Sequence, residues 1–154
     1  MKKILLLLSF VFISLVGFSQ TYDNYKYNAL NPRGNDGYFL RNYNTGQIYL
    51  TFEGTVRYIQ TPATLNGLFV GAADHLIDVP PSVIGTWPVG TAISTDSGFI
   101  RDMNSPTQAV YLREGTYLRW ILTLDVAERY HFNLSIAVNK YGLSGYTVGP
   151  NITN

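Results

Sequence analysis

The chain has 154 residues, a formal net charge of +1 at pH 7, only 14% charged residues and no cysteine. This balance argues against nucleic-acid binding through a clustered basic surface. The absence of cysteine excludes disulfides, thiol nucleophiles and thiolate metal sites. The 12 Tyr and 14 Gly indicate strands and turns rather than a helical bundle or a disordered tail. We therefore expect a mainly β fold with short helices (β-rich α+β), stabilised by packing.

Residues 1–19 have the features of a bacterial secretory signal peptide. Lys2 and Lys3 precede an apolar run, and Gly17 and Ser19 are the small residues three and one positions before a cut after Ser19. The run of about a dozen residues is too short to cross about 30 Å of hydrocarbon comfortably. Cleavage changes the formal net charge from +1 to −1, because two lysines are lost. We expect a secreted or periplasmic protein with no stable membrane insertion after cleavage.

Residues 20–35 form a Tyr-rich leader that includes Tyr22, Tyr25 and Tyr27. Two interpretations stay open for this segment. It adds an edge strand to this molecule or to a neighbour by β-augmentation, or it is a leader that is only partly ordered. The first interpretation leaves an oligomer open.

The rest of the chain contains one motif twice, over residues 36–96 and 97–154. Four segments recur in the same order: Asp36–Arg41 with Ser97–Arg101, Ile48–Leu50 with Val110–Leu112, Val56–Ile59 with Leu118–Ile121, and Trp87–Gly90 with Tyr146–Gly149. The middle two matches share a shift of 62 positions, as from Tyr49 to Tyr111. About sixty residues is marginal for an independent domain. The recurrence therefore predicts two tandem copies of a small antiparallel β-hairpin repeat packed together.

Each copy begins with a short apolar strand and continues into a hairpin. The strand ends at Arg41 or Arg101, and two alternating runs then flank Glu53-Gly54 or Glu114-Gly115. A glycine between alternating runs supplies positive φ at low cost, so these runs predict tight β-hairpins.

A short helix and a further strand follow in each copy. Thr61 and Pro62 predict a helix start that Gly67 ends after about one turn. Thr123 predicts the second helix, running to about His131. The later apolar runs, 76–79 and 134–138, predict strands.

The order of Val/Ile-Tyr-Leu, hairpin Gly, hydrophobic-Arg-aromatic-Ile, Thr-Pro-x-Thr-Leu and Val-Gly-x-x-Ile resembles a repeat found in tandem in many secreted bacterial proteins. The resemblance covers residues 37–93 and 98–152. It implies a module that accompanies catalytic or anchoring domains and has no reaction attributed to it. The second copy departs from the pattern, because it has Leu124 where the first has Pro62.

The histidines do not predict a metal site. Asp74, His75 and Asp78 offer ligand types that suit zinc, but His75 has no second histidine at helical or hairpin spacing and would need distant partners. His131 is interpreted as a helix-end residue over the core. We expect no metal and no cofactor.

The sequence predicts no catalytic residue. Gly142–Gly145 breaks the spacing of a nucleophile elbow and is interpreted as a turn. Glycoside hydrolysis needs two carboxyl groups about 5–10 Å apart in a cleft. Glu53 and Glu114 are matched between the copies, but they are interpreted as solvated turn residues.

Six residues are candidates for binding, and each also has a structural interpretation. Alternation places Arg57 on the face of Ile48, Leu50 and Ile59, and Arg119 on the matching face. Each arginine either ties its repeat together, for instance against a loop carbonyl, or contacts an anion or a sugar. The aromatic candidates stack on sugar rings or fill the core: Tyr58 with Trp120, and Trp87 with Tyr146.

These observations support three hypotheses. The first is a non-enzymatic binding or adhesion module whose partner is a glycan or other envelope polymer, or a protein. Two linked copies would raise the apparent affinity of such a module. The second is a structural subunit of an extracellular filament or envelope assembly formed by strand addition. The third, which the residues favour least, is a small secreted hydrolase.

Overall fold

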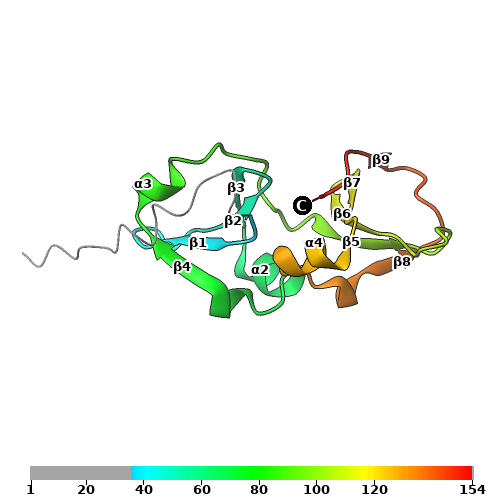
Figure 1. The fold of residues 1–154 in the computed structure, drawn as a ribbon, viewed down its shortest axis with the longest axis horizontal. Helices are drawn as coiled ribbons and strands as arrows, with labels where there is room; N and C mark the ends of the chain where they lie inside the picture. Colours follow the sequence, from blue (N-terminus) through cyan, green and yellow to red (C-terminus); the bar gives the residue numbers. More distant parts are fainter. Residues whose placement is uncertain (1–35, 154) are drawn as a thin grey trace, which may run out of the picture.

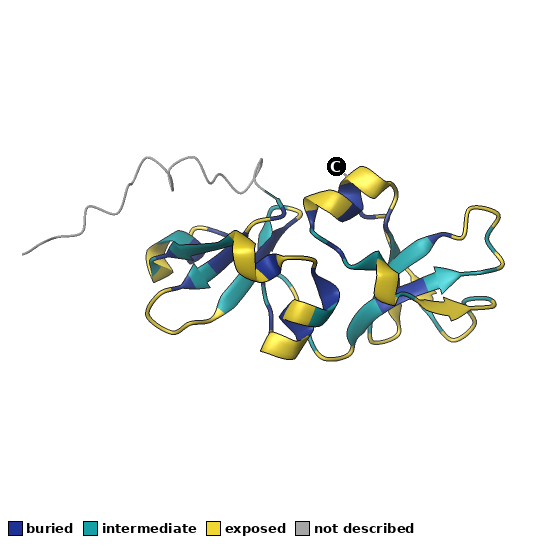
Figure 2. Ribbon diagram, turned by 90° about the horizontal axis from the view of Figure 1, so that it is seen from below, coloured by how far each residue is buried: buried dark blue, intermediate teal, exposed yellow. Residues whose placement is uncertain are grey.

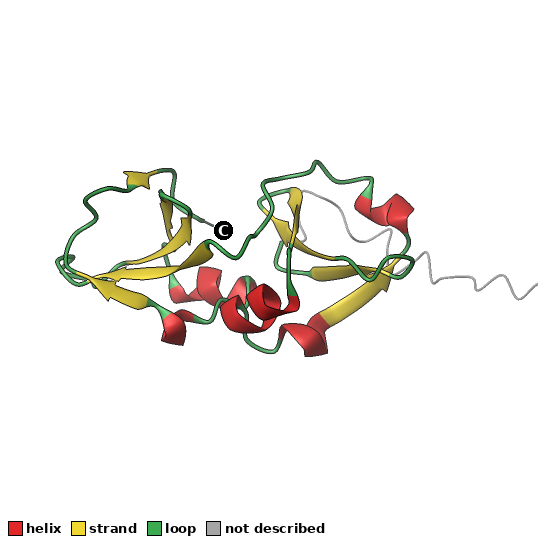
Figure 3. Cartoon of the chain, turned by 180° about the vertical axis from the view of Figure 1, so that it is seen from behind, coloured by secondary structure: helices red, strands yellow, loops and turns green. Residues whose placement is uncertain are grey.

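The computed structural model describes residues 36–153. The expected β-rich fold with short helices is confirmed, with two sheets and the helices α2 and α4 between them (Figure 1; Figure 3). The predicted signal peptide and leader lie outside the described residues. No helix within residues 36–153 has the length and apolar character needed to cross a membrane.

The first sheet has the strand order β3-β2-β1-β4, in which β4 runs parallel to β1 and the other neighbours are antiparallel. Its strands are β1 (Phe39–Asn42), β2 (Ile48–Phe52), β3 (Thr55–Tyr58) and β4 (Leu76–Val79). Helix α2 (Pro62–Leu68) and the 3₁₀ turn η1 (Ala72–His75) join β3 to β4, and α3 (Pro81–Ile84) follows.

The second sheet has the order β8-β5-β6-β7-β9, in which β8 and β9 are parallel to their neighbours. Its strands are β5 (Ser97–Asp102), β6 (Val110–Glu114), β7 (Tyr117–Trp120), β8 (Val138–Lys140) and β9 (Thr147–Val148). Helix α4 (Leu124–Arg129) and the 3₁₀ turn η2 (Leu134–Ile136) lie between β7 and β8.

The two sheets use matching strand registers. Leu50 pairs with Arg57 in the first sheet, and Leu112 pairs with Arg119 in the second. The parallel pairings between the third strand of each hairpin sheet and the end of each motif also match. In the first sheet Val56 pairs with Val89 and Ile59 with Ile93, and in the second Leu118 pairs with Val148 and Ile121 with Ile152. These offsets agree with the shifts between the two sequence motifs.

The two hairpins turn at different positions relative to their glutamates. Glu53 and Gly54 form the first turn with φ of 49° and 72°, as a type I′ turn requires. In the second hairpin Glu114 pairs with Tyr117, so Gly115 and Thr116 form the turn. The predicted equivalence of Glu53 and Glu114 as turn residues is wrong, because Glu114 is the last residue of β6.

Both predicted helix starts are present, but the predicted ends differ. Thr61 and Thr123 are N-caps whose hydroxyls accept from backbone N–H groups three residues later, at 3.0 and 3.3 Å. Helix α2 continues through Gly67 to Leu68, because Leu65 and Leu68 are buried in the core. Helix α4 ends at Arg129, and the run 134–138 forms a 3₁₀ turn and only then enters β8.

One hydrophobic core is shared by both halves. The ring of Phe132 lies 5.2 Å from that of Phe99, 6.0 Å from that of Phe69 and 6.4 Å from that of Phe52. An antiparallel bridge joins Phe69 to Phe132 at the same place. Figure 2 shows buried segments in both sheets and in the central helices. A smaller cluster around Trp87 lies under α3 on the far face of the first sheet.

Gly37 is predicted to be the least replaceable turn glycine of the first sheet. Its φ is +88°, and an added Cβ would lie 2.0 Å from the carbonyl oxygen of Arg129. Gly46 also has positive φ, at +72°, but nothing lies within 4 Å of an added Cβ. We expect Gly37→Ala to lower the free energy of unfolding by about 3 kcal/mol, against about 1 kcal/mol for Gly46→Ala. Urea denaturation measures both, and equal losses would contradict this packing of α4.

Candidate functional site

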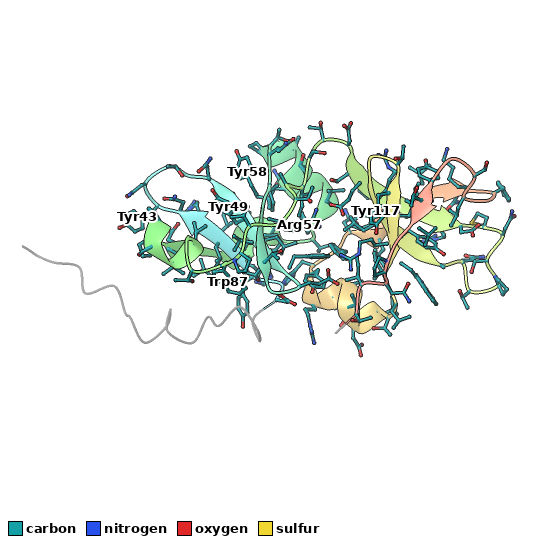
Figure 4. The ribbon with its side chains drawn as sticks, turned by 90° about the horizontal axis from the view of Figure 1, so that it is seen from above. Tyr43, Tyr49, Arg57, Tyr58, Trp87 and Tyr117 are labelled. Atoms are coloured by element: carbon teal, nitrogen blue, oxygen red, sulfur yellow. The ribbon has the colours of Figure 1, made fainter. Side chains whose placement is uncertain are left out.

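A groove with a volume of about 590 Å³ lies between the two hairpins, where the two sheets face each other. We call it the inter-sheet groove, and its lining comes from both halves of the chain: Phe52, Glu53, Thr55, Arg57, Gly90, Thr91, Glu114, Tyr117, Arg119 and Pro150. Figure 4 places Arg57 and Tyr117 near the middle of the molecule, on the two sides of this junction.

Two ion pairs cross the groove reciprocally. Arg57 on β3 binds Glu114 on β6, and Arg119 on β7 binds both carboxylate oxygens of Glu53, at 2.5 and 2.6 Å. Each arginine therefore reaches the glutamate of the other sheet. The predicted solvation is wrong for Glu114, of whose side chain only 18% is exposed. Glu53 is exposed, as predicted, but its carboxylate is bound by Arg119.

Both arginines are also tied to loop carbonyls of their own half. Arg57 Nε donates to the Thr91 carbonyl at 2.5 Å, and Arg119 Nε donates to the Pro150 carbonyl at 3.0 Å. This is the contact that the structural interpretation of these arginines expects. Only 5% of the Arg57 side chain and 15% of the Arg119 side chain are exposed.

Phe52 lies beneath both guanidinium groups. Its ring centroid is 5.0 Å from Arg57 Cζ and 5.6 Å from Arg119 Cζ, and both contacts are cation–π interactions. Phe52 belongs to the shared core. The floor of the groove is therefore continuous with the packing that joins the two halves.

The groove is polar but balanced in charge. Two arginines face two glutamates, and the hydrogen bond with Glu53 is the main cause that raises the pKa of Arg119. The most exposed aromatic group of the lining is Tyr117, of which 38% is accessible. Its hydroxyl group lies over Gly149, where an added Cβ would come within 1.8 Å of the hydroxyl oxygen. The accessible lining thus combines an aromatic ring with hydrogen-bonding groups of both kinds.

Of the six candidate binding residues, the structure brings together only Arg57 and Arg119. Tyr58 and Trp120 lie half-buried, in register with Tyr49 and Tyr111 on the sheet faces turned away from the shared core. Trp87 is buried beside α3.

Tyr146 is also half-buried, and it lines a different cleft, at the edge of the second sheet. The sequence interpretation missed Tyr117. The recurring Val-Gly motif could have indicated Tyr117, because the missing side chain of Gly149 leaves the space that the Tyr117 ring occupies.

A separate cleft of about 470 Å³ brings the two histidines together, with ring centroids 4.5 Å apart. Asp36, Asp74 and Arg129 also line this histidine cleft. His131 is distant from His75 in the sequence, so the pair agrees with the expectation that partners of His75 would have to be distant ones. Within residues 36–153, no group of three or more His, Cys, Asp or Glu side chains is arranged to hold a metal ion.

Comparison with known proteins identifies no relative. No protein-family model matches the chain, no curated protein matches it, and no solved structure matches it. The function of the groove is therefore argued from its own chemistry.

The arginine pairs predict unequal losses of stability. Arg57→Met leaves a largely buried Glu114 and the Thr91 carbonyl without their partner, so we expect a loss of about 3–5 kcal/mol. Arg119→Met breaks a more exposed pair and should cost about 1–2 kcal/mol. The double variant Arg57→Met/Glu114→Leu should recover part of the first loss, because no unpaired carboxylate remains.

Arg41→Met is the control for these variants, because 43% of the Arg41 side chain and 46% of its partner Asp78 are exposed. Chemical denaturation should show almost no change for it. A larger loss for Arg119→Met than for Arg57→Met would contradict the ranking by burial.

The histidine cleft predicts a pH-dependent stability. Burial, with a smaller contribution from His75, lowers the pKa of His131 below its ordinary 6.5. The unfolded chain therefore takes up the proton first, and the free energy of unfolding falls as the pH drops through 6.5 towards the native pKa.

His131→Asn should flatten this dependence, and asparagine tolerates the φ of +55° at this position. Thermal unfolding between about pH 7.5 and pH 5 measures it against the wild type. An equal dependence of stability on pH in the variant and the wild type would contradict the role of His131 in it.

Proposed function

We propose that the mature chain is a secreted, non-enzymatic binding module that holds a glycan or a related envelope polymer in the inter-sheet groove. The observation that carries this proposal is the lining of the groove. Tyr117 stands beside two reciprocal arginine–glutamate pairs whose charges cancel. Export through residues 1–19 and the duplication of residues 36–96 in 97–154 are parts of the same proposal.

Sugars suit this lining for two reasons. Each hydroxyl group of a sugar both donates and accepts, and the groove offers guanidinium donors beside carboxylate and carbonyl acceptors. One face of a sugar ring is apolar and packs on an aromatic ring such as that of Tyr117. A polyanion would gain little from a groove in which two positive charges are already neutralised.

The same geometry supports a non-enzymatic role. Glycoside hydrolysis needs one carboxylic acid that donates a proton and a second carboxylate that acts as base or nucleophile. Here Glu53 and Glu114 are each bound by an arginine from the other sheet. Both carboxylates stabilise the junction between the sheets, and neither stands unpaired beside the other.

A second candidate is a structural subunit that assembles by strand addition. The observation in its favour is β8, an edge strand of the second sheet whose three residues are all exposed. An exposed edge accepts a strand from another chain, and residues 20–30 would supply it. Sizing the mature protein with and without residues 20–30 tests this candidate, and a monomer in both cases excludes it.

Glycan-array and envelope-polymer pulldown experiments on residues 20–154 test the binding proposal. We expect Tyr117→Ala to weaken binding to the retained polymer about tenfold, as loss of a central aromatic anchor does. The chain offers Tyr43→Ala as a matched control, because Tyr43 is an exposed tyrosine at the far end of the first sheet (Figure 4). No binding to any polymer, or equal loss for both variants, would contradict the proposal.

A further inference from the structure

A third cavity, of about 320 Å³, lies at the free edge of the second sheet. Strand β8 pairs with β5 only from Ile100 onward, so the start of β5 borders an open cleft. Its polar lining includes Ser97, Arg113, Lys140 and Tyr146, and its apolar lining includes Ile136 and Val138. We call it the cationic cleft.

The backbone of β5 positions Arg113 in this cleft. Arg113 stands opposite Gly98 across the β5–β6 pair. A Cβ built on Gly98 would lie 3.3 Å from Arg113 Nη2 and 3.7 Å from its Nε. The guanidinium therefore lies against backbone that carries no side chain. Tyr38 and Thr51 occupy the corresponding positions of the first sheet, so this arrangement belongs to the second sheet alone.

Within residues 36–153, neither cation of the cleft, Arg113 or Lys140, has an anionic partner. Among residues 36–153, the ion pairs are those of Arg41, Arg57 and Arg119, and no carboxylate lines the cleft. Asp102 stands opposite Lys140 across the β5–β8 pair, but its carboxylate accepts from the Asn104 backbone N–H at 3.0 Å and forms no ion pair. The cleft thus carries two positive charges beside an apolar lining.

We propose that the cationic cleft binds a carboxylate-bearing sugar residue, a uronate, within the polymer. This inference rests on the proposed glycan-binding function. The planar guanidinium of Arg113 matches a carboxylate in a bidentate manner, and Lys140 adds a second charge. The half-buried ring of Tyr146 offers a face to the sugar ring. A volume of about 320 Å³ is at the small end of ligand pockets, which suits a single residue.

The matching edge of the first sheet has a different balance of charge. There the histidine cleft contains two carboxylates, Asp36 and Asp74, beside the two histidines and one arginine, Arg129. A carboxylate ligand would meet like charges in it, so only one of the two edge clefts is suited to an acidic residue. The inferred stoichiometry is therefore one uronate per chain, although the motif occurs twice.

The test uses residues 20–154 and two soluble probes, trigalacturonate and its fully methyl-esterified form. Isothermal titration should show at least tenfold tighter binding of the acid. The variant Arg113→Gln/Lys140→Gln should abolish this difference and leave binding of the ester unchanged. Arg101→Gln, which removes a charge from β5 outside the cleft, is the matched control and should keep the difference.

Several results would overturn the inference. Equal affinity for the acid and the ester would do so, as would an equal effect of the control variant. If inorganic phosphate binds as tightly as free galacturonate, the cleft is a general anion site and not a uronate site. A tetraglutamate peptide that binds more tightly than trigalacturonate would assign the cleft to a protein partner.

The same titrations separate this inference from the proposed function. In one outcome the ester and all neutral glycans fail to bind, whereas free galacturonate binds to the wild type and not to Arg113→Gln/Lys140→Gln. The glycan-groove proposal then fails and the uronate site stands. If Tyr117→Ala weakens binding of the ester and the acid equally while the cleft variant changes neither, the groove stands and the uronate site is overturned.

Discussion

The side chains of Arg57 and Arg119 meet over the ring of Phe52, and each binds a glutamate of the other sheet. An arginine buried on an apolar strand face must find acceptors for its donors, because an unpaired buried charge is costly. Here the acceptors come from both halves of the chain, as one carboxylate and at least one loop carbonyl for each guanidinium. Neither half could satisfy its own arginine without the other, so the charge network and the aromatic core require the same arrangement of the two sheets.

That arrangement explains why two marginal units form one body. Phe69 and Phe132 follow the two central helices and pair with each other as an antiparallel bridge. Their rings join those of Phe52 and Phe99 in a core to which both sheets contribute. A unit of about sixty residues is marginal as an independent domain, and the shared core adds buried surface to both units in a chain that has no cysteine for disulfides.

The local elements were predictable, and the contacts between them were not. Alternating side chains and turn glycines define the hairpins, and Thr61 and Thr123 define the helix starts, because these signals act within a few residues. The partner of Arg57 is 57 residues away in the chain, in the other motif. Pairwise comparison of the motifs placed Glu53 and Glu114 in equivalent turns, although the strand register shifts one of them into a strand. The glutamate partners of the two arginines were therefore not predictable, because they are distant in sequence and because the hairpin registers differ by one residue.

Matched positions and diverged positions carry different information in this chain. Arg57 and Arg119 recur because the junction uses both, and Gly90 and Gly149 recur because the residues beside them, Thr55 and Tyr117, need the space. Residues at positions where the motifs differ are not required for the packing that both halves share, so these residues can serve a binding site instead. Tyr117 replaces Thr55 at the groove, and Gly98 with Arg113 replaces Tyr38 with Thr51 at the sheet edge. Both inferred binding sites thus depend on residues that the second motif has and the first does not.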